Sequence, residues 1–263
     1  MSSTNEIPSP TGLLIIDKPL GKTSMHVCAN IRARLRSAGA PKRIKVGHAG
    51  TLDPLATGVL VVLVGKATRL QDRFMAGRKR YTARVDLSAT SRTDDREGPV
   101  SPVECESASR AAIEAVLPQF VGTIMQRPPA YSAMKVGGRR AYDLARKSET
   151  EADMPVLAHR PITIDSIDIL DYVWPILTLD IACAKGTYIR SLARDIGEQL
   201  NTGGMLDGLI RTQVGRYTLN QVHKLSDLPS LLTQQDLLAI PDDLLNQAPA
   251  DSASDSSEDA ADS

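Results

Sequence analysis

One carboxylate in the sequence, Asp53, lies in a segment whose residue types favour an unusual backbone conformation. The segment spans residues 47–58 and has the sequence Gly-His-Ala-Gly-Thr-Leu-Asp-Pro-Leu-Ala-Thr-Gly. Its three glycines permit positive φ angles, and Pro54 restricts the backbone beside the carboxylate. Lys45 and Arg69 flank the segment, and nearby positive charge favours the ionised form of the carboxylate. An ionised carboxylate on a stiff loop can act as a nucleophile or a base, but the same pattern fits an Asp that only stabilises a turn.

Other residues that could bind phosphate, act as nucleophiles or hold a metal lack the spacing that such sites need. Residues 21–23, Gly-Lys-Thr, resemble the end of a phosphate-binding loop, yet Ile16 stands where that loop requires its first glycine. Ser132 does not lie in a Gly-x-Ser-x-Gly turn, so nothing marks it as a nucleophile. The histidines and cysteines show no metal-ligand spacing and no disulfide pattern; they are His26, His48, His159, His223, Cys28, Cys105 and Cys183. We therefore expect no catalytic metal.

The elements that must position Asp53 are visible in the hydrophobic pattern. Residues 13–16 and 59–64 are apolar runs typical of buried strands. Between them, Thr23 or Ser24 can cap a helix that has an apolar residue at every fourth position. Elements mixed without strict β-α-β alternation predict an α+β fold with a mixed, largely antiparallel central sheet flanked by helices and loops. The other predicted strands are 81–87, 162–170 and 176–183, and the other predicted helices are 108–117 and 189–200.

The composition is typical of a globular protein in a reducing compartment. The chain has 263 residues and is 42% hydrophobic, which suffices for the core of one large domain or two small ones. No stretch approaches the roughly 18 consecutive apolar residues of a membrane span, and the first residues lack the apolar run of a secretory signal. We expect a cytoplasmic protein that does not bind membranes.

The net charge of zero hides an uneven distribution of charges. No Lys or Arg follows Lys224, whereas nine acidic residues do, so residues 1–224 carry a net charge of about +9. Between Asp17 and Asp53 there are eight cations and no acid. A basic body is typical of proteins that bind polyanions, although a run of like charges also fits an ordinary solvated surface.

Five blocks of the sequence form a specific combination. They are residues 17–24 (D-K-P-L-G-K-T-S), 47–58, 79–81 (K-R-Y), 127–135 (R-P-P-A-Y-S-A-M-K) and 185–190 (K-G-T-Y-I-R). With these blocks in this order, the chain resembles the TruB family of tRNA pseudouridine synthases, whose catalytic motif is G-H-x-G-x-L-D-P-x-A-x-G. The resemblance extends from residue 12 to about 217 and includes the pseudouridine synthase catalytic fold.

The resemblance implies an isomerase that converts uridine to pseudouridine at position 55, in the T-loop of tRNA, without a cofactor. In this reaction the N-glycosidic bond breaks, the uracil turns, and the ring rejoins the ribose through C5, with no redox change. Asp53 is implied to be the catalytic residue, acting at C1′ of the ribose or at C6 of the uracil, and the sequence leaves both routes open. Because the target base lies inside a folded loop, it must be flipped out.

The resemblance also implies roles for five further residues. Arg190 is implied to pair with the catalytic carboxylate, which would keep that group ionised and aimed. Tyr81 is implied to stack on the flipped uracil, and His48 to fill the space that the base leaves. Tyr188 and Leu209 correspond to positions that line the base pocket, although Leu209 also fits a plain core position.

The basic residues are expected to bind the tRNA backbone, and the chain is expected to act as a monomer. We predict a flexible arm over residues 1–11, the catalytic domain over 12–224, a short C-terminal extension over 225–250 and a disordered acidic tail over 251–263. Residues 127–147 are predicted to form a basic, RNA-contacting arm with one helical segment. The extension is too short and acidic to be the complete RNA-binding module that relatives often carry there. The predicted RNA contacts are Lys22, Lys45, Arg69, Arg127, Lys135, Arg139 and Arg140.

Two other functions use the same features differently. A non-catalytic module that binds and folds tRNA would keep the basic surface but would not need Asp53, Tyr81 and Arg190 together. A glycosidase would use Asp53 with a second carboxylic acid, for which Asp94 and Asp95 are the nearest candidates. The sequence places these two in a turn-rich connection with no sign of a pocket.

Overall fold

The computed structural model describes residues 9–132, 134–136, 139–141 and 157–246. Three predictions therefore lie outside the described residues, wholly or in part. They concern the N-terminal arm up to residue 8, the basic arm beyond residue 141 with its helical segment, and the acidic tail.

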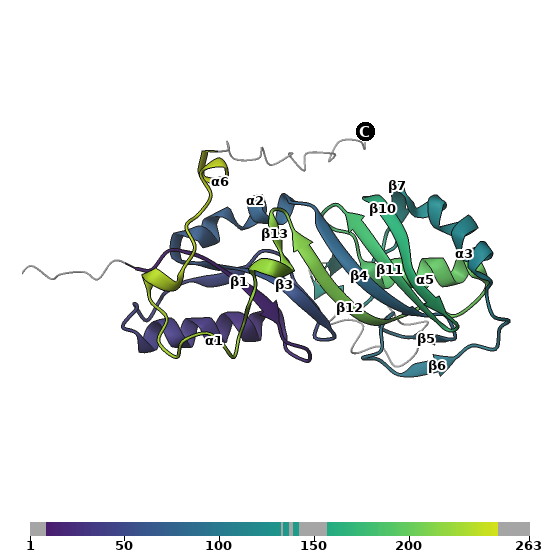
Figure 1. Cartoon of the computed structure of the whole chain (residues 1–263), viewed down its shortest axis with the longest axis horizontal. Helices are drawn as coiled ribbons and strands as arrows, with labels where there is room; N and C mark the ends of the chain where they lie inside the picture. Colours follow the sequence, from purple (N-terminus) through teal and green to yellow (C-terminus); the bar gives the residue numbers. More distant parts are fainter. Residues whose placement is uncertain (1–8, 133, 137–138, 142–156, 247–263) are drawn as a thin grey trace, which may run out of the picture.

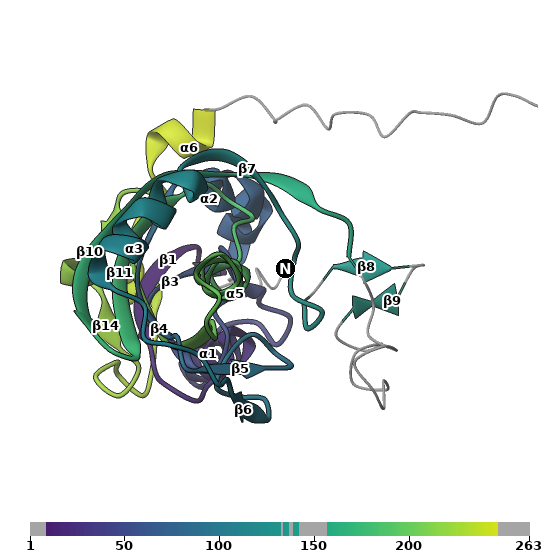
Figure 2. The same ribbon diagram turned by 90° about the vertical axis from the view of Figure 1, so that its right-hand side faces the viewer.

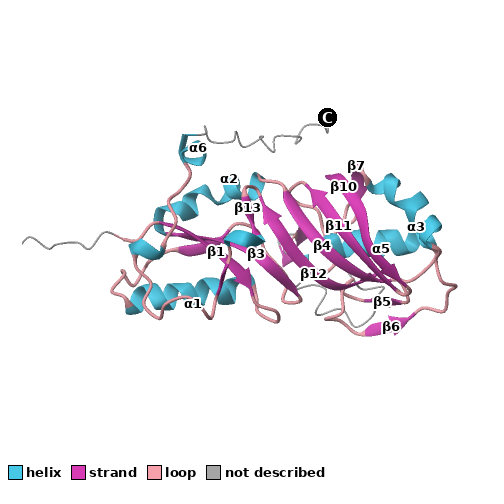
Figure 3. Cartoon of the chain, viewed as in Figure 1, coloured by secondary structure: helices cyan, strands magenta, loops and turns pink. Residues whose placement is uncertain are grey.

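The centre of the fold is one sheet that contains ten strands of the described chain (Figure 1, Figure 3). These strands are β1 (Gly12–Lys18), β2 (Val46–His48), β3 (Ala56–Val64), β4 (Lys79–Asp86), β7 (Gly122–Gln126), β10 (Arg160–Val173), β11 (Ile176–Cys183), β12 (Met205–Val214), β13 (Tyr217–Thr218) and β14 (His223–Lys224). Their order is β14, β1, β3, β12, β4, β11, β10 and β7, with β2 paired to β3 and β13 to β12. All pairs are antiparallel except β1 with β14 and β3 with β12. The prediction of a mixed, largely antiparallel sheet is confirmed.

Helices cover the two ends of this sheet differently. Near β1 and β3, α1 (Ser24–Ser37) packs on one face, and α2 (Gln71–Ala76) packs on the opposite face. Near β4, β11 and β10, α3 (Arg110–Val116) and α5 (Ile189–Leu200) pack on one face. Figure 2 shows the sheet curving around α5. The last described helix is α6 (Asp242–Asn246), and no described helix is long and apolar enough to cross a membrane.

The different coverage explains two patterns in the sequence. In β3, Leu60 and Val62 contact the α1 side while Val59 and Val61 contact the α2 side, so both faces are apolar. In β4, buried and less buried residues alternate strictly, because only the face toward α5 is covered. The continuous run and the alternation therefore predicted the burial of these strands correctly.

Helix α5 was predicted with its observed bounds, but its end has a different cause. The chain leaves the helix through Asn201, which adopts a left-handed conformation with φ 54°. Gly203 and Gly204 serve close packing instead: a Cβ on Gly203 would lie 2.4 Å from the backbone nitrogen of Ala89. The segment that follows the helix is therefore packed against β5 (Ala89–Ser91), which pairs with β6 (Val100–Pro102).

Two of the arginines of α1, Arg32 and Arg34, bind backbone carbonyls with their guanidinium groups. The N-cap is Thr23, as expected, and the buried stripe includes the predicted apolar residues. Arg32 donates from Nη2 to the carbonyl of Val46 at 2.8 Å, and Arg34 donates from Nη2 to the carbonyl of Leu225 at 3.0 Å. These cations connect α1 to neighbouring backbone segments.

Five described strands of the central sheet were not predicted: β2, β7, β12, β13 and β14. Of these, β2, β13 and β14 have only two or three residues. β12 contains register shifts between Leu206 and Gly208 and between Arg211 and Gln213, and such irregularities break the alternation that marks a strand. β7 has only five residues and lies at the sheet edge. The prediction that Pro118 stops a helix was also incomplete, because a 3₁₀ helix, Leu117–Phe120, continues from α3.

The described residues after Lys224 fold back onto α1 and the sheet. Leu228, Leu232 and Leu237 are buried in the cluster between α1 and the sheet. Leu238 forms an isolated antiparallel bridge with Leu13 of β1. This part of the extension therefore completes the core around α1.

A substitution in α5 tests the close packing described above. A Cβ on Gly197 would lie 2.2 Å from the carbonyl oxygen of Gly203. Helix propensity alone favours Ala over Gly by about 1 kcal/mol, whereas overpacking costs about 1–3 kcal/mol. We therefore expect Gly197→Ala to lower the free energy of unfolding, measured with urea. The control Gly208→Ala, whose Cβ would meet only Arg84 side-chain atoms at 3.7 Å or more, should change it little.

Candidate active site

The loop that carries Asp53 connects β2 to β3, and three buried polar side chains hold its backbone. Ser24, at the start of α1, accepts a hydrogen bond from the Leu52 nitrogen (2.9 Å) and donates to the Leu52 carbonyl (3.1 Å). Both backbone groups of the residue before Asp53 are thereby fixed to α1. The loop cannot shift along its axis without breaking these bonds.

Lys18 holds the other side of Asp53. Its Nζ donates to the carbonyls of Pro54 (3.3 Å), Pro19 (3.0 Å) and Lys22 (2.5 Å). Burial lowers the pKa of Lys18 to about 8, although the charges of Glu97 and Asp53 act in the opposite direction. The ammonium group thus joins the end of β1 to the loop at the position after the carboxylate.

Arg211 of β12 holds the beginning of the loop and its exit. The side chain donates to the carbonyls of Gly50 (3.1 Å) and Thr51 (3.3 Å), and to that of Val59 in β3 (2.8 Å). It is 1% exposed. Gly58 explains the close approach of the two strands, since its φ is +95° and a Cβ there would lie 2.3 Å from the Arg211 carbonyl.

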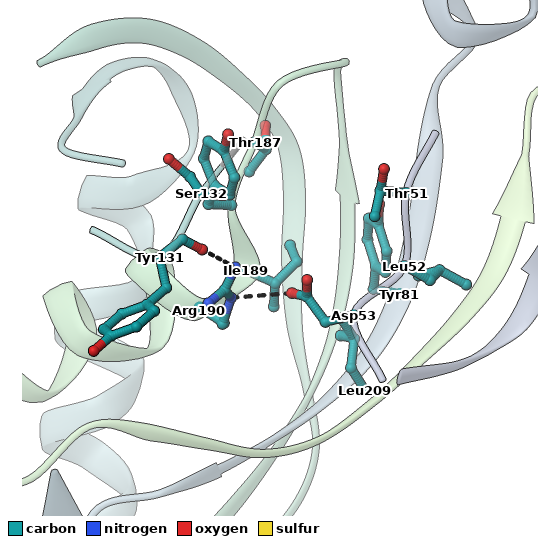
Figure 4. A pocket seen from close by; sticks show the side chains of 11 residues that line it. Thr51, Leu52, Asp53, Tyr81, Tyr131, Ser132, Thr187, Ile189, Arg190 and Leu209 are labelled. Atoms are coloured by element: carbon teal, nitrogen blue, oxygen red, sulfur yellow. Dashed lines mark hydrogen bonds and ion pairs between the residues drawn. The ribbon is translucent and has the colours of Figure 1, made fainter. Parts of the chain in front are cut away.

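Asp53 forms an ion pair with Arg190, as expected. Arg190 lies in the first turn of α5, and its Nε is 3.0 Å from Oδ2 of Asp53 (Figure 4). The side chain of Arg190 is 8% exposed, whereas that of Asp53 is 37% exposed. The cation is therefore part of the interior, while the carboxylate remains open to an incoming molecule.

Arg190 has three further partners, and one of them is a second carboxylate. Its Nη1 lies 3.4 Å from Oδ2 of Asp95 and donates to the carbonyl of Thr93 at 3.1 Å. Its Nη2 donates to the carbonyl of Tyr131 at 3.0 Å. Asp95 does not line the cavity but contacts Arg190 from behind it. The sequence did not indicate this contact, because a contact between distant segments carries no signal in one sequence.

Asp95 is not placed to act as the second acid of a glycosidase. Its side chain is 3% exposed, and Oδ1 accepts hydrogen bonds from Thr93 Oγ1 (2.6 Å) and the Glu97 nitrogen (3.0 Å). With these partners, the Asp95 carboxyl group is used in contacts within the protein and is closed to a substrate.

Asp53 and Arg190 lie at a cavity of about 370 Å³, within the range of sites for small organic groups. Tyr81 of β4, Leu209 of β12 and Tyr188 before α5 all line this cavity, as predicted. Figure 4 shows Asp53 and Arg190 between Tyr81 and Leu209 on one side and Tyr131 on the other. The remaining lining residues, which were not predicted, are Thr51, Leu52, Tyr131, Ser132, Thr187 and Ile189.

Tyr81 and His48 differ in how they meet the expectation. Tyr81 lines the cavity, and burial raises the pKa of its phenol. His48, on β2, is not among the residues that line it. Burial, followed by the charge of Arg211, lowers the pKa of His48. The imidazole is thus placed as a neutral group beside the loop, and its buried Nδ1 has no hydrogen-bond partner among the described residues.

Lys45 and Arg69 lie at a second hollow rather than at the Asp53 cavity. They line a space of about 250 Å³ together with Arg43 and Lys66, and no acidic residue lines it. In the structure, Asp53 pairs instead with Arg190, and its negative charge acts on Lys18, whose pKa it raises against the effect of burial. We define the basic pocket as Arg43, Lys45, Lys66 and Arg69.

The other predicted RNA contacts are dispersed. Lys22 is exposed, after the end of β1. Arg127 lines a hollow that also includes Asp195 and Glu198, and its Nη2 is 3.9 Å from Oε1 of Glu198. Lys135 lies in β8 (Lys135–Val136), which pairs with β9 (Arg139–Arg140). No group of three or more His, Cys, Asp or Glu side chains in the described part of the chain could hold a metal ion.

Comparisons with known proteins identify one family along the chain. Residues 36–189 match the family model of the TruB family pseudouridylate synthase N-terminal domain, and residues 190–248 match that of the tRNA pseudouridylate synthase B C-terminal domain. The chain is 45% identical over 226 residues to tRNA pseudouridine synthase B of Phocaeicola vulgatus, covering 86% of this chain and 94% of that protein. It is 42% identical over 248 residues to the protein of the same name from Corynebacterium diphtheriae, covering 89% and 79%.

Solved structures show the same fold in a larger assembly. A chain in the crystal structure of a Cbf5-Nop10-Gar1 complex superposes with a TM-score of 0.63 at 29% sequence identity. The superposition covers 82% of this chain and 53% of that chain, so the present protein spans about half of the length of this structural relative.

The three-residue network of Asp53, Arg190 and Asp95 has a measurable energetic consequence. Arg190→Met leaves the buried Asp95 carboxylate without its cation, and we expect a loss of about 3–5 kcal/mol in the free energy of unfolding. Adding Asp95→Asn should recover a large part of this loss. Urea unfolding of the single and double variants measures both effects, and a double variant as unstable as Arg190→Met alone would contradict the argument. In the control, Arg84→Met breaks a solvent-exposed pair with Asp207 and should cost less than about 1 kcal/mol.

Proposed function

The chain belongs to the TruB family of pseudouridylate synthases, and we propose that its target is the uridine at position 55 in the T-loop of tRNA. The protein is an enzyme that isomerises uridine to pseudouridine in tRNA, the activity for which its relatives are named. The observation that carries the proposal for the site is the ion pair of Asp53 and Arg190 at the 370 Å³ cavity. A flipped uracil is a small, flat group that suits a cavity of this size.

The carboxylate of Asp53 does the covalent or proton-transfer work. It attacks C1′ of the ribose or C6 of the uracil, the N-glycosidic bond breaks, and the turned ring forms the C5–C1′ bond. The bond to Asp53 is broken again before the product leaves, C5 loses its proton and N1 takes up a proton, so the product is an isomer of the substrate. The reaction is an isomerisation without redox change, so we infer that it needs no cofactor and no metal. Both routes require an ionised, aimed carboxylate, which the Arg190 guanidinium stabilises at 3.0 Å.

The remaining pocket residues hold the base. Tyr81 offers a ring face for stacking on the flipped uracil, and Leu209 and Tyr188 complete the walls. His48 lies beside the loop, and its low pKa keeps the imidazole neutral; we assign it to the space that the base leaves in the RNA. These assignments give each of the predicted site residues a task that its position permits.

The tRNA backbone is bound by cations outside the cavity. The basic pocket has four cations and no acid, which is the composition needed for phosphate contacts. We infer that Lys22, Arg127 and the residues of the β8–β9 hairpin contact the T-arm on the side of the cavity. We infer that the protein acts as a monomer, because one chain supplies both Asp53 and Arg190. We also infer that it acts in the cytoplasm, where its tRNA substrate is found.

A tRNA-folding module without catalysis is the weaker proposal. It would need the basic surfaces but not a carboxylate held by Lys18, Ser24, Arg211 and Arg190 at a cavity. Positioning of this kind is typical of reacting groups.

Replacement of the carboxylate separates catalysis from binding. Asp53→Asn keeps the size and shape of the side chain but cannot act as nucleophile or base, so we expect no turnover. The measurement is tritium release from a tRNA transcript labelled at uridine C5, because only formation of the C5 bond expels that hydrogen. Wild-type protein should release tritium from position 55, whereas the variant should bind tRNA without release. Binding by wild type with no release would favour the folding module.

Neutralising the basic pocket should weaken tRNA binding through electrostatics alone. For Lys45→Gln/Arg69→Gln we expect the slope of log affinity against log salt concentration to decrease in magnitude by about 2, with the single-turnover rate at saturating enzyme unchanged. Filter binding at several salt concentrations measures the slope. The control Arg78→Gln/Arg110→Gln removes the same charge from exposed cations that pair with Asp165 and Glu114. An equal change in both variants would show that only net charge matters.

A further inference from the structure

Another arginine of α5, the largely buried Arg194, lies one helical turn after Arg190, and the proposed reaction does not use it. Its side chain is 14% exposed. Nη1 donates to Oδ2 of Asp94 at 2.9 Å, and Nη2 donates to the carbonyl of Arg127 at 3.0 Å. Asp195 occupies the remaining face of the guanidinium, with Oδ1 at 3.0 Å from Nε and 2.8 Å from Nη2.

Asp94, the main partner of Arg194, has a backbone conformation that non-glycine residues rarely adopt. Its φ is +58°, and such a residue costs free energy unless its surroundings fix it. The backbone around it is tied to β12 by bonds from the Leu206 nitrogen to the Asp94 carbonyl (3.0 Å) and from the Arg96 nitrogen to the Leu206 carbonyl (3.1 Å). The ion pair with Arg194 fixes the side chain of the same residue.

Asp94 stands between two groups that bind Arg190. Thr93, immediately before it, provides a carbonyl to Nη1 of Arg190, and Asp95, immediately after it, provides a carboxylate to the same atom. The left-handed residue therefore makes the turn that aims both neighbours at one guanidinium. Any other backbone conformation at Asp94 would point at least one of them elsewhere.

The second contact of Arg194 holds the other side of Arg190. The carbonyl of Arg127, which accepts from Arg194, lies four residues before that of Tyr131, which accepts from Nη2 of Arg190. Arg194 thus contacts both backbone segments that surround Arg190, residues 93–95 and 127–131. Arg190 itself bonds to Asp53 through Nε, the atom left over from these contacts.

We propose, on the basis of the proposed function, that Arg194 and Asp94 are positioning residues of the reaction. They hold the two segments that orient the Arg190 guanidinium, and Arg190 in turn orients the carboxylate of Asp53. Neither residue lines the cavity, so neither touches the substrate there. A displacement of reacting groups by about 1 Å can cost on the order of 100-fold in rate. Residues that hold Arg190 in one orientation should therefore affect the rate even though they do not touch the substrate.

A purely structural role for the pair makes a different prediction. If Arg194 and Asp94 only stabilise the fold, their loss lowers the unfolding midpoint but leaves the chemical step of the folded enzyme unchanged. If they position Arg190, the rate of the chemical step falls while tRNA affinity is retained, since no RNA-facing group changes. Measuring the rate of the chemical step and the tRNA affinity separately therefore distinguishes the two cases.

The experiment uses the full chain and single-turnover tritium release at saturating enzyme, with filter binding and urea unfolding of the same samples. Three variants are compared. Asp94→Gly tolerates positive φ but removes the carboxylate, and Asp94→Asn tolerates the same conformation and keeps one acceptor. Arg194→Lys keeps the positive charge but lacks the planar guanidinium that donates to two partners at once. We expect Asp94→Gly and Arg194→Lys to lower the rate about 10- to 100-fold with tRNA affinity unchanged. Asp94→Asn should retain more of the rate than Asp94→Gly.

Two controls distinguish the outcomes. Gly197→Ala destabilises the same helix without touching the ion pairs, and it should leave the single-turnover rate of the folded enzyme unchanged. In an Arg190→Lys background, Asp94→Gly should have almost no further effect on the rate, because the group that it positions is gone. Wild-type rates in Asp94→Gly and Arg194→Lys, or a full additional loss in the Arg190→Lys background, would overturn the inference. Absence of tritium release by wild type would instead overturn the proposed function.

Discussion

The ion pair between Asp53 and Arg190 is the contact on which the rest of the site depends, because it joins the two parts of the fold. Asp53 comes from the part in which β1 and β3 are covered on both faces, and Arg190 comes from the helix that covers one face of β4, β11 and β10. A 3.0 Å contact between them requires that both parts be placed accurately. On the Arg190 side, that accuracy comes from the carbonyls of Thr93 and Tyr131 and the carboxylate of Asp95, which bind the guanidinium.

On the Asp53 side, the accuracy comes from buried cations bound to carbonyl oxygens. Lys18 and Arg211 each donate to three backbone carbonyls around the loop. Burying a cation is costly, as the lowered pKa of Lys18 indicates, and the carbonyl dipoles offset only part of that cost. Apolar side chains of similar size would cost less free energy to bury, but they could not fix the direction of individual carbonyl groups. The cations therefore contribute geometry more than stability.

Features that arise from local chemistry could be predicted from the sequence, and features that arise from distant contacts could not. The Thr23 cap, the alternation in β4 and the apolar stripe of α5 depend on neighbours in the chain. In contrast, a bond from an arginine to a distant carbonyl has no sequence pattern, so the roles of Arg211 and Arg32 were missed. The contact of Asp95 with Arg190 was not predicted for the same reason, since only the fold brings the turn of residues 93–95 to α5. The family resemblance supplied Arg190 and Tyr81, which spacing alone would have left as ordinary residues.

The position of the cavity follows from the pairing of β3 with β12. This parallel contact covers only three residues, from Leu209 opposite Ala56 to Arg211 opposite Gly58. On its other edge, β12 pairs with β4, so that Leu209 lies opposite Ala83 and Arg211 opposite Tyr81. The register of two strand pairs thus fixes Leu209, Tyr81 and the exit of the Asp53 loop relative to one another. Because a shift by one residue would turn each side chain to the other face, the hydrogen bonding of the sheet determines which side chains line the cavity.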